Sequence, residues 1–395
     1  MNLVDSKSST IYFFFIILYA VAYMGNAVFQ TFLPVYLDSI DLSKTEIAAL
    51  LSFGPLMAIL AQPIWGSIGD RSKTKNSVLQ LLMFGSALSV LFFPLSNHFV
   101  YLLVIMCLVT FFQTSVYPMG DAITLEYLSE TKWNFGPIRL AGTIGFALMS
   151  VGFGLYARNQ IDSIFIVYCL IMLLAMVISF KLPKVKGHQA SGNKVKIWVV
   201  FKNRKLVLLL LLSFIVQVSL GYYYAFFPIF YKELGADTSL LGWSMLVSAS
   251  SEIPFLLFAD KIIKRFGVPL ILLSTAFFAG VRWLCFYFVE SPYLVLPIQL
   301  FHGAIFIVLM VTMAMFINEE VPRELKASGQ TMYGLISLGI ARITGSILGG
   351  MTAESVGMRE VFLYSSILMF LTLIVFAFIF MRDVSFAKKS SAKTS

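Results

Sequence analysis

Long apolar runs dominate the pattern of this chain, and short polar segments separate them. Each run approaches or exceeds the ~20 residues that an α-helix needs to cross the hydrocarbon core of a bilayer. The pattern therefore predicts an all-α membrane protein. The twelve predicted transmembrane helices are residues 11–37, 46–66, 77–96, 98–127, 136–157, 162–182, 204–231, 239–259, 268–289, 292–317, 328–352 and 360–381.

The composition agrees with this interpretation. Of the 395 residues, 59% are hydrophobic and 12% are charged, and the charged fraction of soluble domains is about twice as large. The first run is too long for the apolar part of a signal peptide, and no small-residue cleavage site follows it, so we expect it to be retained. All three cysteines fall inside predicted helices, which favours packing over disulfides.

The distribution of basic residues predicts the orientation. With the N-terminus in the cytoplasm, 22 of the 29 Lys and Arg residues lie in cytoplasmic segments. This is a strong positive-inside signal. It predicts a multi-pass protein of the cell membrane, inner or plasma, with both termini cytoplasmic. The cations flank helices and form no single patch, so nucleic acid is not expected as a partner.

A basic segment divides the chain into two sets of six helices. Residues 183–203 contain Gly, Ser and several lysines and predict a solvated cytoplasmic linker between residues 1–182 and 204–395, with a short cytoplasmic tail after the last helix. The halves echo each other, since GSIGDRSKTK (66–75) follows the second helix and ADKIIKRFG (259–267) follows the eighth. Such internal repeats are typical of secondary transporters.

The first of these loops resembles the loop signature of the major facilitator superfamily, through Gly66, Asp70, Arg71 and the lysines after them. The usual Gly after the Asp-Arg pair is absent. The resemblance covers the whole chain and implies the major facilitator fold, with twelve helices in two six-helix halves. It also implies that Gly66 allows close helix approach and that Asp70 and Arg71 belong to a cytoplasmic gate. The alternative is a solvated loop that only sets topology.

Arg139, near the start of the fifth helix, is expected to have a partner, because an unpaired charge inside a bilayer is costly. Pro137 suits the first helical turn, so Arg139 lies one turn inside the helix. The hairpin with the fourth helix brings Asp121 and Glu126 close to this level, and either carboxylate could pair with Arg139. Alternatively, Arg139 extends to the headgroups. Two glycines on this helix, Gly142 and Gly145, predict close packing with a neighbour.

Four polar groups of the second half lie near the middles of helices eight to eleven. Glu252, Arg282, His302 and Arg342 share one depth and are expected to form one network. Burial favours the protonated form of a carboxylate and a nearby arginine favours the ionised form, as a proton-coupling site requires. The alternatives are a static pair of Glu252 with Arg342 or Arg282, a structural Arg282 and a plain core histidine.

Helices one and seven carry polar stripes. The residues of helix one are spaced as on one helical face and predict a cavity lining. The tyrosines of helix seven could instead form a belt at the membrane interface. The two sets are Tyr19, Tyr23, Asn26 and Gln30, and Gln217, Tyr222, Tyr223 and Tyr224.

Residues 32–71 and FGPIRLAGTIGF (135–146) resemble the branch of phenylpropionate permeases and nucleoside–proton symporters. The resemblance implies that Arg139, Thr143, Phe146 and Gln217 bind substrate and that Ser251-Glu252 matches a Ser-Glu pair of the symporters. Two features depart from them. The tenth helix carries His302-Gly303 in place of a carboxylate, and Arg342 stands where the branch has a small residue, which favours an anionic or hydroxyl-rich solute.

These observations predict a secondary active transporter, not an enzyme. The predicted activity is proton-coupled uptake of a small organic solute, such as a sugar, nucleoside or aromatic acid, by alternating access. Substrate residues are Arg139, Thr143, Phe146, Gln217, Asn26, Gln30 and Tyr223, and proton-coupling residues are Glu252, Asp121, His302 and Arg342.

No catalytic residue, metal or cofactor is expected, and no P-loop for ATP is present. The expected partners are the solute, a proton and the lipid bilayer, and the expected form is a monomer. The alternative function is proton-driven efflux of drugs or metabolites. The absence of an acidic residue in the first helix favours uptake.

Overall fold

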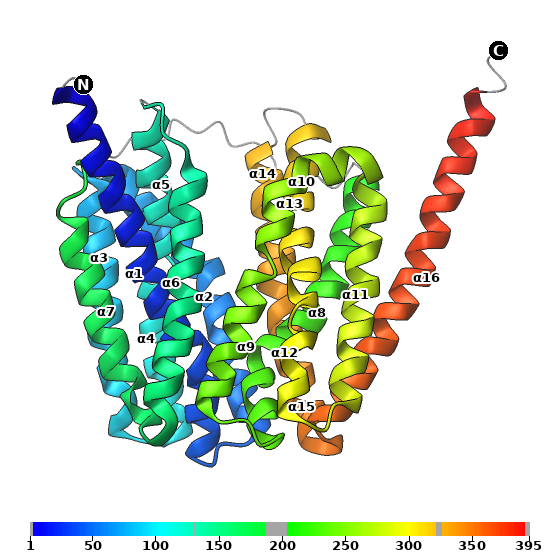
Figure 1. Ribbon diagram of the computed structural model, residues 1–395, viewed down its shortest axis with the longest axis horizontal. Coiled ribbons are helices and arrows are strands. Elements are labelled where there is room, and N and C mark those ends of the chain that lie inside the picture. Colours follow the sequence, from blue (N-terminus) through cyan, green and yellow to red (C-terminus); the bar gives the residue numbers. More distant parts are fainter. Residues whose placement is uncertain (1–2, 130, 187–203, 321–325, 392–395) are drawn as a thin grey trace. The chain divides into compact units, whose positions relative to one another are not determined.

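The computed structural model describes residues 3–129, 131–186, 204–320 and 326–391, and it is helical throughout these segments apart from short turns (Figure 1). Among these residues, twelve spans are long and apolar enough to cross a membrane. The predicted number of spans is confirmed. The largest difference concerns the eleventh span, which begins at Gly334 and not at residue 328.

The chain packs as two compact units. The first comprises Met1–Asn193 with Ala225–Leu246, and the second comprises Lys194–Tyr224 with Val247–Ser395. The predicted division at a linker of residues 183–203 stays a prediction, because residues 187–203 lie outside the described part of the chain.

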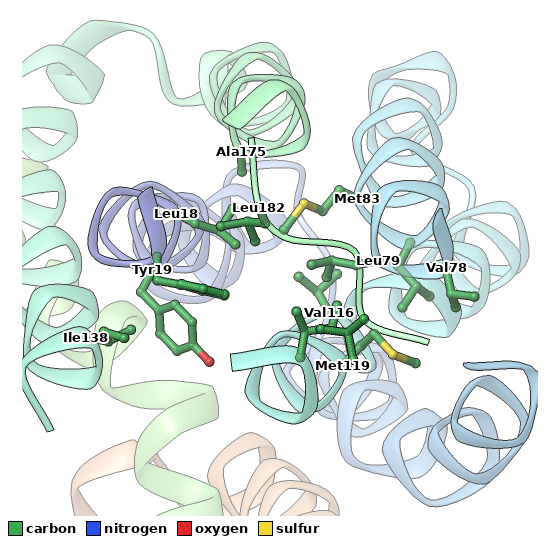
Figure 2. Close-up of a cluster of buried hydrophobic side chains, with 14 of the residues drawn as sticks. Leu18, Tyr19, Val78, Leu79, Met83, Val116, Met119, Ile138, Ala175 and Leu182 are labelled. Atoms are coloured by element: carbon green, nitrogen blue, oxygen red, sulfur yellow. The ribbon is translucent and has the colours of Figure 1, made fainter. Parts of the chain in front are cut away.

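The first unit contains the first six spans. Its helices are α1 (Leu3–Ser39), α2 (Lys44–Arg71), α3 (Lys75–Ser89), η1 (Val90–Leu95), α4 (Phe99–Gln113), α5 (Val116–Ser129), α6 (Phe135–Tyr156), η2 (Ala157–Asn159), η3 (Ile161–Ser163) and α7 (Ile164–Ser179). α1 packs along both α6 and α7. Apolar side chains from several helices meet in its core, among them Leu18, Met83, Val116 and Ile138 (Figure 2).

The remaining helices are α8 (Arg204–Glu233), α9 (Thr238–Ser250), α10 (Ile253–Phe266), α11 (Val268–Phe288), η5 (Pro292–Leu294), α12 (Val295–Ile298), α13 (Phe301–Glu320), α14 (Lys326–Tyr333), the π-helix η7 (Gly334–Ile340), α15 (Ala341–Val356) and α16 (Met358–Ser391). The boundary between the units passes through α8, after Tyr224, and through α9, after Leu246. In the second unit, α11 packs against α13 and α16.

Several spans are interrupted, and proline explains two of the interruptions. Proline lacks the N–H that would bond to the carbonyl four residues earlier, and its ring clashes with that carbonyl. Pro254 stands four residues after Ser250, the last residue of α9, and Pro118 stands four residues after Thr114, where α4 ends. The eighth span is therefore broken at Ser251 and Glu252.

Glycine allows corresponding helices of each unit to pack backbone to backbone. In the first unit, a Cβ atom at Gly145 of α6 would overlap the carbonyl group of Ala20 in α1. In the second unit, a Cβ atom at Gly345 of α15 would overlap the carbonyl group of Val218 in α8. Small residues permit such approaches between membrane helices. These contacts confirm the close packing expected at Gly145, and they bring an arginine of α6 and another of α15 beside tyrosines of α1 and α8.

Candidate functional site

Glu252 lies at the break between α9 and α10, where its side chain is half-buried. The break packs directly on the start of α13, because the backbone N–H of Gly303 donates to Ser251 Oγ at 2.8 Å. A Cβ atom at Gly303 would overlap the carbonyl oxygen of Ser251. The glycine after His302 thus allows the histidine to approach the carboxylate, and Glu252 Oε1 lies 3.5 Å from His302 Nε2.

The second nitrogen of His302 faces a permanent donor. Arg282 Nη1 lies 3.0 Å from His302 Nδ1, and a guanidinium has no acceptor atom. Nδ1 must therefore accept, so the neutral imidazole carries its hydrogen on Nε2, toward Glu252 and toward the Tyr224 hydroxyl, which lies 3.3 Å away. The geometry fixes the tautomer of His302.

Arg282 is fully buried and is held without a carboxylate in ion-pair contact among the described residues. Its Nη2 donates to Gln299 Oε1. The guanidinium carbon lies 4.2 Å from the ring centre of Tyr223 and 5.1 Å from that of Trp283. Cation–π contacts of this kind stabilise a desolvated guanidinium. The alternative of a static Glu252–Arg282 or Glu252–Arg342 pair is not seen in the described residues, where the titratable partner of Glu252 is His302.

Arg342 joins the same cluster through Tyr224. Its guanidinium carbon lies 4.7 Å from the ring centre of Tyr224, and its Nε donates to Gln217 Oε1 at 3.4 Å. The structure therefore brings together all four charged or titratable residues that the sequence placed at one depth. The sequence did not identify Gln299 as a member, although its oxygen accepts from both Arg282 and Tyr223.

The tyrosines of α8 are not a belt at the membrane surface. Tyr222 and Tyr223 are each 2% exposed. The Tyr222 hydroxyl donates to the carbonyl oxygen of Met358 at 2.9 Å, and the Tyr223 hydroxyl donates to Gln299 Oε1 at 3.0 Å. Tyr223 was predicted to contact substrate, but the structure places it beneath Arg282 with its hydroxyl engaged.

In the first unit, the expected carboxylate partner of Arg139 is wrong. Asp121 accepts a short hydrogen bond from the Tyr19 hydroxyl, and Glu126 pairs with Lys75 at 2.8 Å. Both carboxylates thus have other partners. Arg139 instead lies over the ring of Tyr23, with its guanidinium carbon 4.5 Å from the ring centre.

The other residues predicted to bind substrate in this unit differ in exposure. Thr143, Phe146 and Asn26 are half-buried, and Gln30 is exposed. Of the residues predicted to bind substrate in this unit, Asn26 and Arg139 each have a buried polar atom without a hydrogen-bond partner among the described residues, namely Asn26 Oδ1 and Arg139 Nη1. Gly142 brings α6 against Tyr23, since a Cβ atom there would lie 2.8 Å from the tyrosine ring. The close packing expected at Gly142 is confirmed.

The loop after α2 is tied to its neighbours by Lys75, which lies 3.9 Å from Asp70 Oδ1 and 2.8 Å from Glu126 Oε2. An added Cβ atom at Gly66 would meet no described atom within 4 Å, and the close helix approach implied for Gly66 stays a prediction. A close approach is present one turn later. It occurs at Gly69, where a Cβ atom would lie 2.6 Å from Met119. Arg71 is exposed.

One known protein family matches this chain over most of its length. The model of the MFS_1 like family, within the major facilitator superfamily, matches residues 8–364. The chain belongs to this family. The MFS_1 like chain is therefore a multi-pass membrane transporter and not an enzyme, and its twelve helical spans have the major facilitator fold.

Two curated relatives and one solved structure illustrate the family. The uncharacterized transporter YwbF of Bacillus subtilis (strain 168) is 25% identical over 358 residues, which cover 89% of this chain and 88% of the relative. Maltose permease of Geobacillus stearothermophilus is also 25% identical over 358 residues, with 90% of each covered. The crystal structure of the nucleoside transporter NupG has a TM-score of 0.83 at 17% identity and covers 93% of this chain and 98% of NupG.

Proposed function

We propose that this MFS_1 like transporter takes up a small organic solute together with a proton, by alternating access. The observation that carries the proposal is the environment of Glu252, a carboxylate that lies at a helix break inside a span and whose titratable partner is a histidine. A carboxylate paired with arginine would stay ionised, whereas one beside a neutral imidazole can gain and lose a proton. Ionisable residues within spans mark proton relays.

The hydrogen bonds around His302 support both states of the carboxylate. When Glu252 is ionised, the Nε2 hydrogen of His302 points toward an acceptor 3.5 Å away. When Glu252 carries the proton, the Tyr224 hydroxyl at 3.3 Å is a second acceptor for the same hydrogen. We assign Glu252 as the proton carrier, with His302 and Arg342 as supporting groups. Asp121, hydrogen-bonded to Tyr19, has the corresponding role in the first unit.

The solute would be held by polar and aromatic groups of three helices. Arg139 has a buried nitrogen with no described partner, and its spacing places it on the same face of α6 as Thr143 and Phe146. The names of maltose permease and of the nucleoside transporter NupG support a sugar or a nucleoside, and an aromatic acid remains within the proposed range. The proposed contacts are Arg139, Thr143 and Phe146 of α6, Asn26 and Gln30 of α1, and Gln217 of α8, with Tyr223 acting through Arg282.

The proposal places both termini in the cytoplasm, because this orientation puts 22 of the 29 Lys and Arg residues on that side. The ion pairs of Lys75 with Asp70 and Glu126 then lie at the cytoplasmic ends of α2, α3 and α5. We infer that Asp70, Arg71 and Gly66 belong to a gate at this end. We propose a monomer as the transporting form.

External pH in an unbuffered suspension of de-energised cells tests the proposal. Cells that express the protein are pulsed with candidate sugars, nucleosides and aryl acids in turn. We expect one class of compound to make the medium more alkaline. The signal should disappear in Glu252→Gln and persist in Glu290→Gln, a matched change at an exposed site outside the spans.

Each other outcome has a definite meaning. A signal that survives Glu252→Gln keeps symport but removes Glu252 as the carrier. Acidification by a compound, or silence across the panel with the protein shown to be in the membrane, contradicts uptake of these solutes and favours proton-driven efflux.

A further inference from the structure

Arg342 is a half-buried cation whose hydrogen-bonding capacity is mostly unused. Its guanidinium carbon lies 4.7 Å from the ring centre of Tyr224 and 5.6 Å from that of Phe306. Its single hydrogen bond to a described residue joins Nε to Gln217 Oε1 at 3.4 Å. A guanidinium presents its N–H donors as a planar fork, so the outer edge of the Arg342 fork has no acceptor within the described residues.

Two buried side chains beside Arg342 each have one polar atom without a hydrogen-bond partner among the described residues. Gln217 is 0% exposed, and its Nε2 forms no hydrogen bond with a described residue. The hydroxyl of Tyr333, which is 4% exposed, lies beside Gln217 and Ser213 but forms no hydrogen bond of good geometry. Buried polar groups of native proteins are nearly always paired. All of the unpaired groups can donate, so the missing partner is rich in acceptors.

The charged side chains within the spans of this unit also favour an acceptor-rich partner, and one with a negative charge. Among the described residues that lie more than one helical turn from the ends of its spans, the charged groups are Arg282, Arg342 and Glu252, and Arg282 holds His302 neutral. One positive charge therefore remains even when Glu252 is ionised. Both terminal nitrogens of Arg282 are engaged, by His302 and Gln299, and only its Nε lacks a partner among the described residues. Arg342 is the reverse case, because only its Nε has an acceptor among the described residues. A charge within a membrane span calls for a partner.

We propose that Arg342, Gln217 and Tyr333 bind the carboxylate of the transported solute, which is therefore an organic anion. This inference rests on the proposed function and narrows its solute class. Two carboxylate oxygens match a guanidinium fork in a bidentate pair, and their remaining lone pairs can accept from Gln217 Nε2 and the Tyr333 hydroxyl. The rings of Tyr224 and Phe306 keep the fork in one orientation.

Other solute groups fit this site less well. The hydroxyls of a neutral sugar accept hydrogen bonds, but they leave the positive charge uncompensated. A phosphate monoester carries a charge of about −1.5 to −2 at neutral pH, which exceeds the single excess charge of the unit. One carboxylate accepts hydrogen bonds from the unpaired donors and compensates the single excess positive charge.

Thermal unfolding of the purified full-length protein in detergent tests this site with matched pairs of probes. The pairs are 3-phenylpropionate and 3-phenylpropanol, gluconate and sorbitol, and lactate and propane-1,2-diol. A ligand that binds the native state and not the unfolded state raises Tm, and the rise grows with the ratio of ligand concentration to Kd. We expect at least one acid to raise Tm and its alcohol to have no effect.

Three variants locate the binding. Arg342→Gln should weaken the apparent affinity for that acid by roughly ten- to a hundredfold, the usual range for losing a hydrogen bond to a charged group. Tyr333→Phe keeps the ring and should weaken it by roughly two- to tenfold. Arg265→Gln, a matched change of an exposed arginine at the end of α10, should leave it unchanged.

Stabilisation by a neutral probe that survives Arg342→Gln overturns the proposal, and so does stabilisation by none of the acids at millimolar concentration. If Arg342→Gln does not fold, Tyr333→Phe decides, and an unchanged affinity for the acid overturns the site. The outcome is separable from the proposed symport. An acid that binds but moves no proton contradicts symport alone, and a neutral solute that moves protons contradicts the carboxylate site alone.

Discussion

The permanently charged Arg282 determines the tautomer of His302 beside it. Arg282 can only donate, so His302 Nδ1 accepts and the imidazole directs its hydrogen from Nε2 toward Glu252. A second proton on His302 would place a hydrogen against the guanidinium. This arrangement supports the proposal that Glu252, and not His302, carries the proton. In that proposal Arg282, which contacts His302, is a positioning residue.

The sequence predicted the charged members of this cluster but not their neutral partners. Charged or titratable residues within an apolar run are conspicuous. Their positions in the sequence were therefore enough to identify Glu252, Arg282, His302 and Arg342. Gln299 and Tyr333 are uncharged, and only the fold shows that they are buried beside an arginine.

The expected partner of Arg139 was wrong for a related reason. Depth along a helix can be estimated from sequence, but competition between partners cannot. Tyr19 binds Asp121 and Lys75 binds Glu126 before either carboxylate reaches Arg139.

The bond between Tyr19 and Asp121 gives a prediction at this scale. Tyr19→Phe leaves a partly buried carboxylate without its donor, which should cost about 1–3 kcal/mol of stability. The measurement is chemical or thermal unfolding in detergent. The matched control is Tyr101→Phe, which removes an exposed hydrogen bond to the carbonyl oxygen of Phe92 and should cost about 0.5–1.5 kcal/mol at most. Equal losses would show that Asp121 does not depend on Tyr19.

The membrane-spanning segments were predicted more accurately than the individual helices that form them. Hydropathy finds the twelve crossings because each is a long apolar run. The same measure does not register the break at Ser251 and Glu252, since the apolar run continues through it. Pro254 is the local signal that marks this break. Discontinuous helices in transporters point to binding sites, and Glu252 lies at one.

Two glycines of α6 provide a test at the scale of elements. A Cβ atom at Gly145 would overlap the backbone of Ala20, whereas one at Gly152 would meet nothing within 4 Å. Gly145→Ala should therefore force α1 and α6 apart and lower stability by about 1–3 kcal/mol, as overpacking does. Gly152→Ala should be neutral or stabilising by up to about 1 kcal/mol, because alanine favours a helix. Thermal unfolding of both variants measures the difference, and equal effects would contradict the packing of these helices.

The orientation proposed for the whole molecule rests on where its basic residues lie. Single cysteines at two exposed positions on either side of α11 test it. Glu290→Cys should react with a membrane-impermeant maleimide in intact cells, because its loop is expected outside. Lys264→Cys should react only after permeabilisation. The unmodified chain, whose three cysteines lie within spans, is the background control. The reverse pattern would invert the proposed topology.

Family membership and fold were accessible from sequence because they are spread over the whole chain, in the spans, the repeat and the loop after α2. Solute identity was not, because it depends on a few side chains whose spacing in three dimensions the sequence does not give. The MFS_1 like relatives include proteins named for maltose and, by structure, for nucleosides. The solute therefore has to be inferred from the chemical groups that Arg139 and Arg342 can bind.

The central claim is that Glu252 carries the coupled proton, and transport in proteoliposomes tests it most directly. With the solute identified by the alkalinisation assay, two rates are compared in Glu252→Gln: accumulation driven by a pH gradient, and exchange of labelled for unlabelled solute without a gradient. We predict that accumulation is lost and exchange persists, because the variant binds and moves solute without a proton. Accumulation that persists in Glu252→Gln would contradict the account.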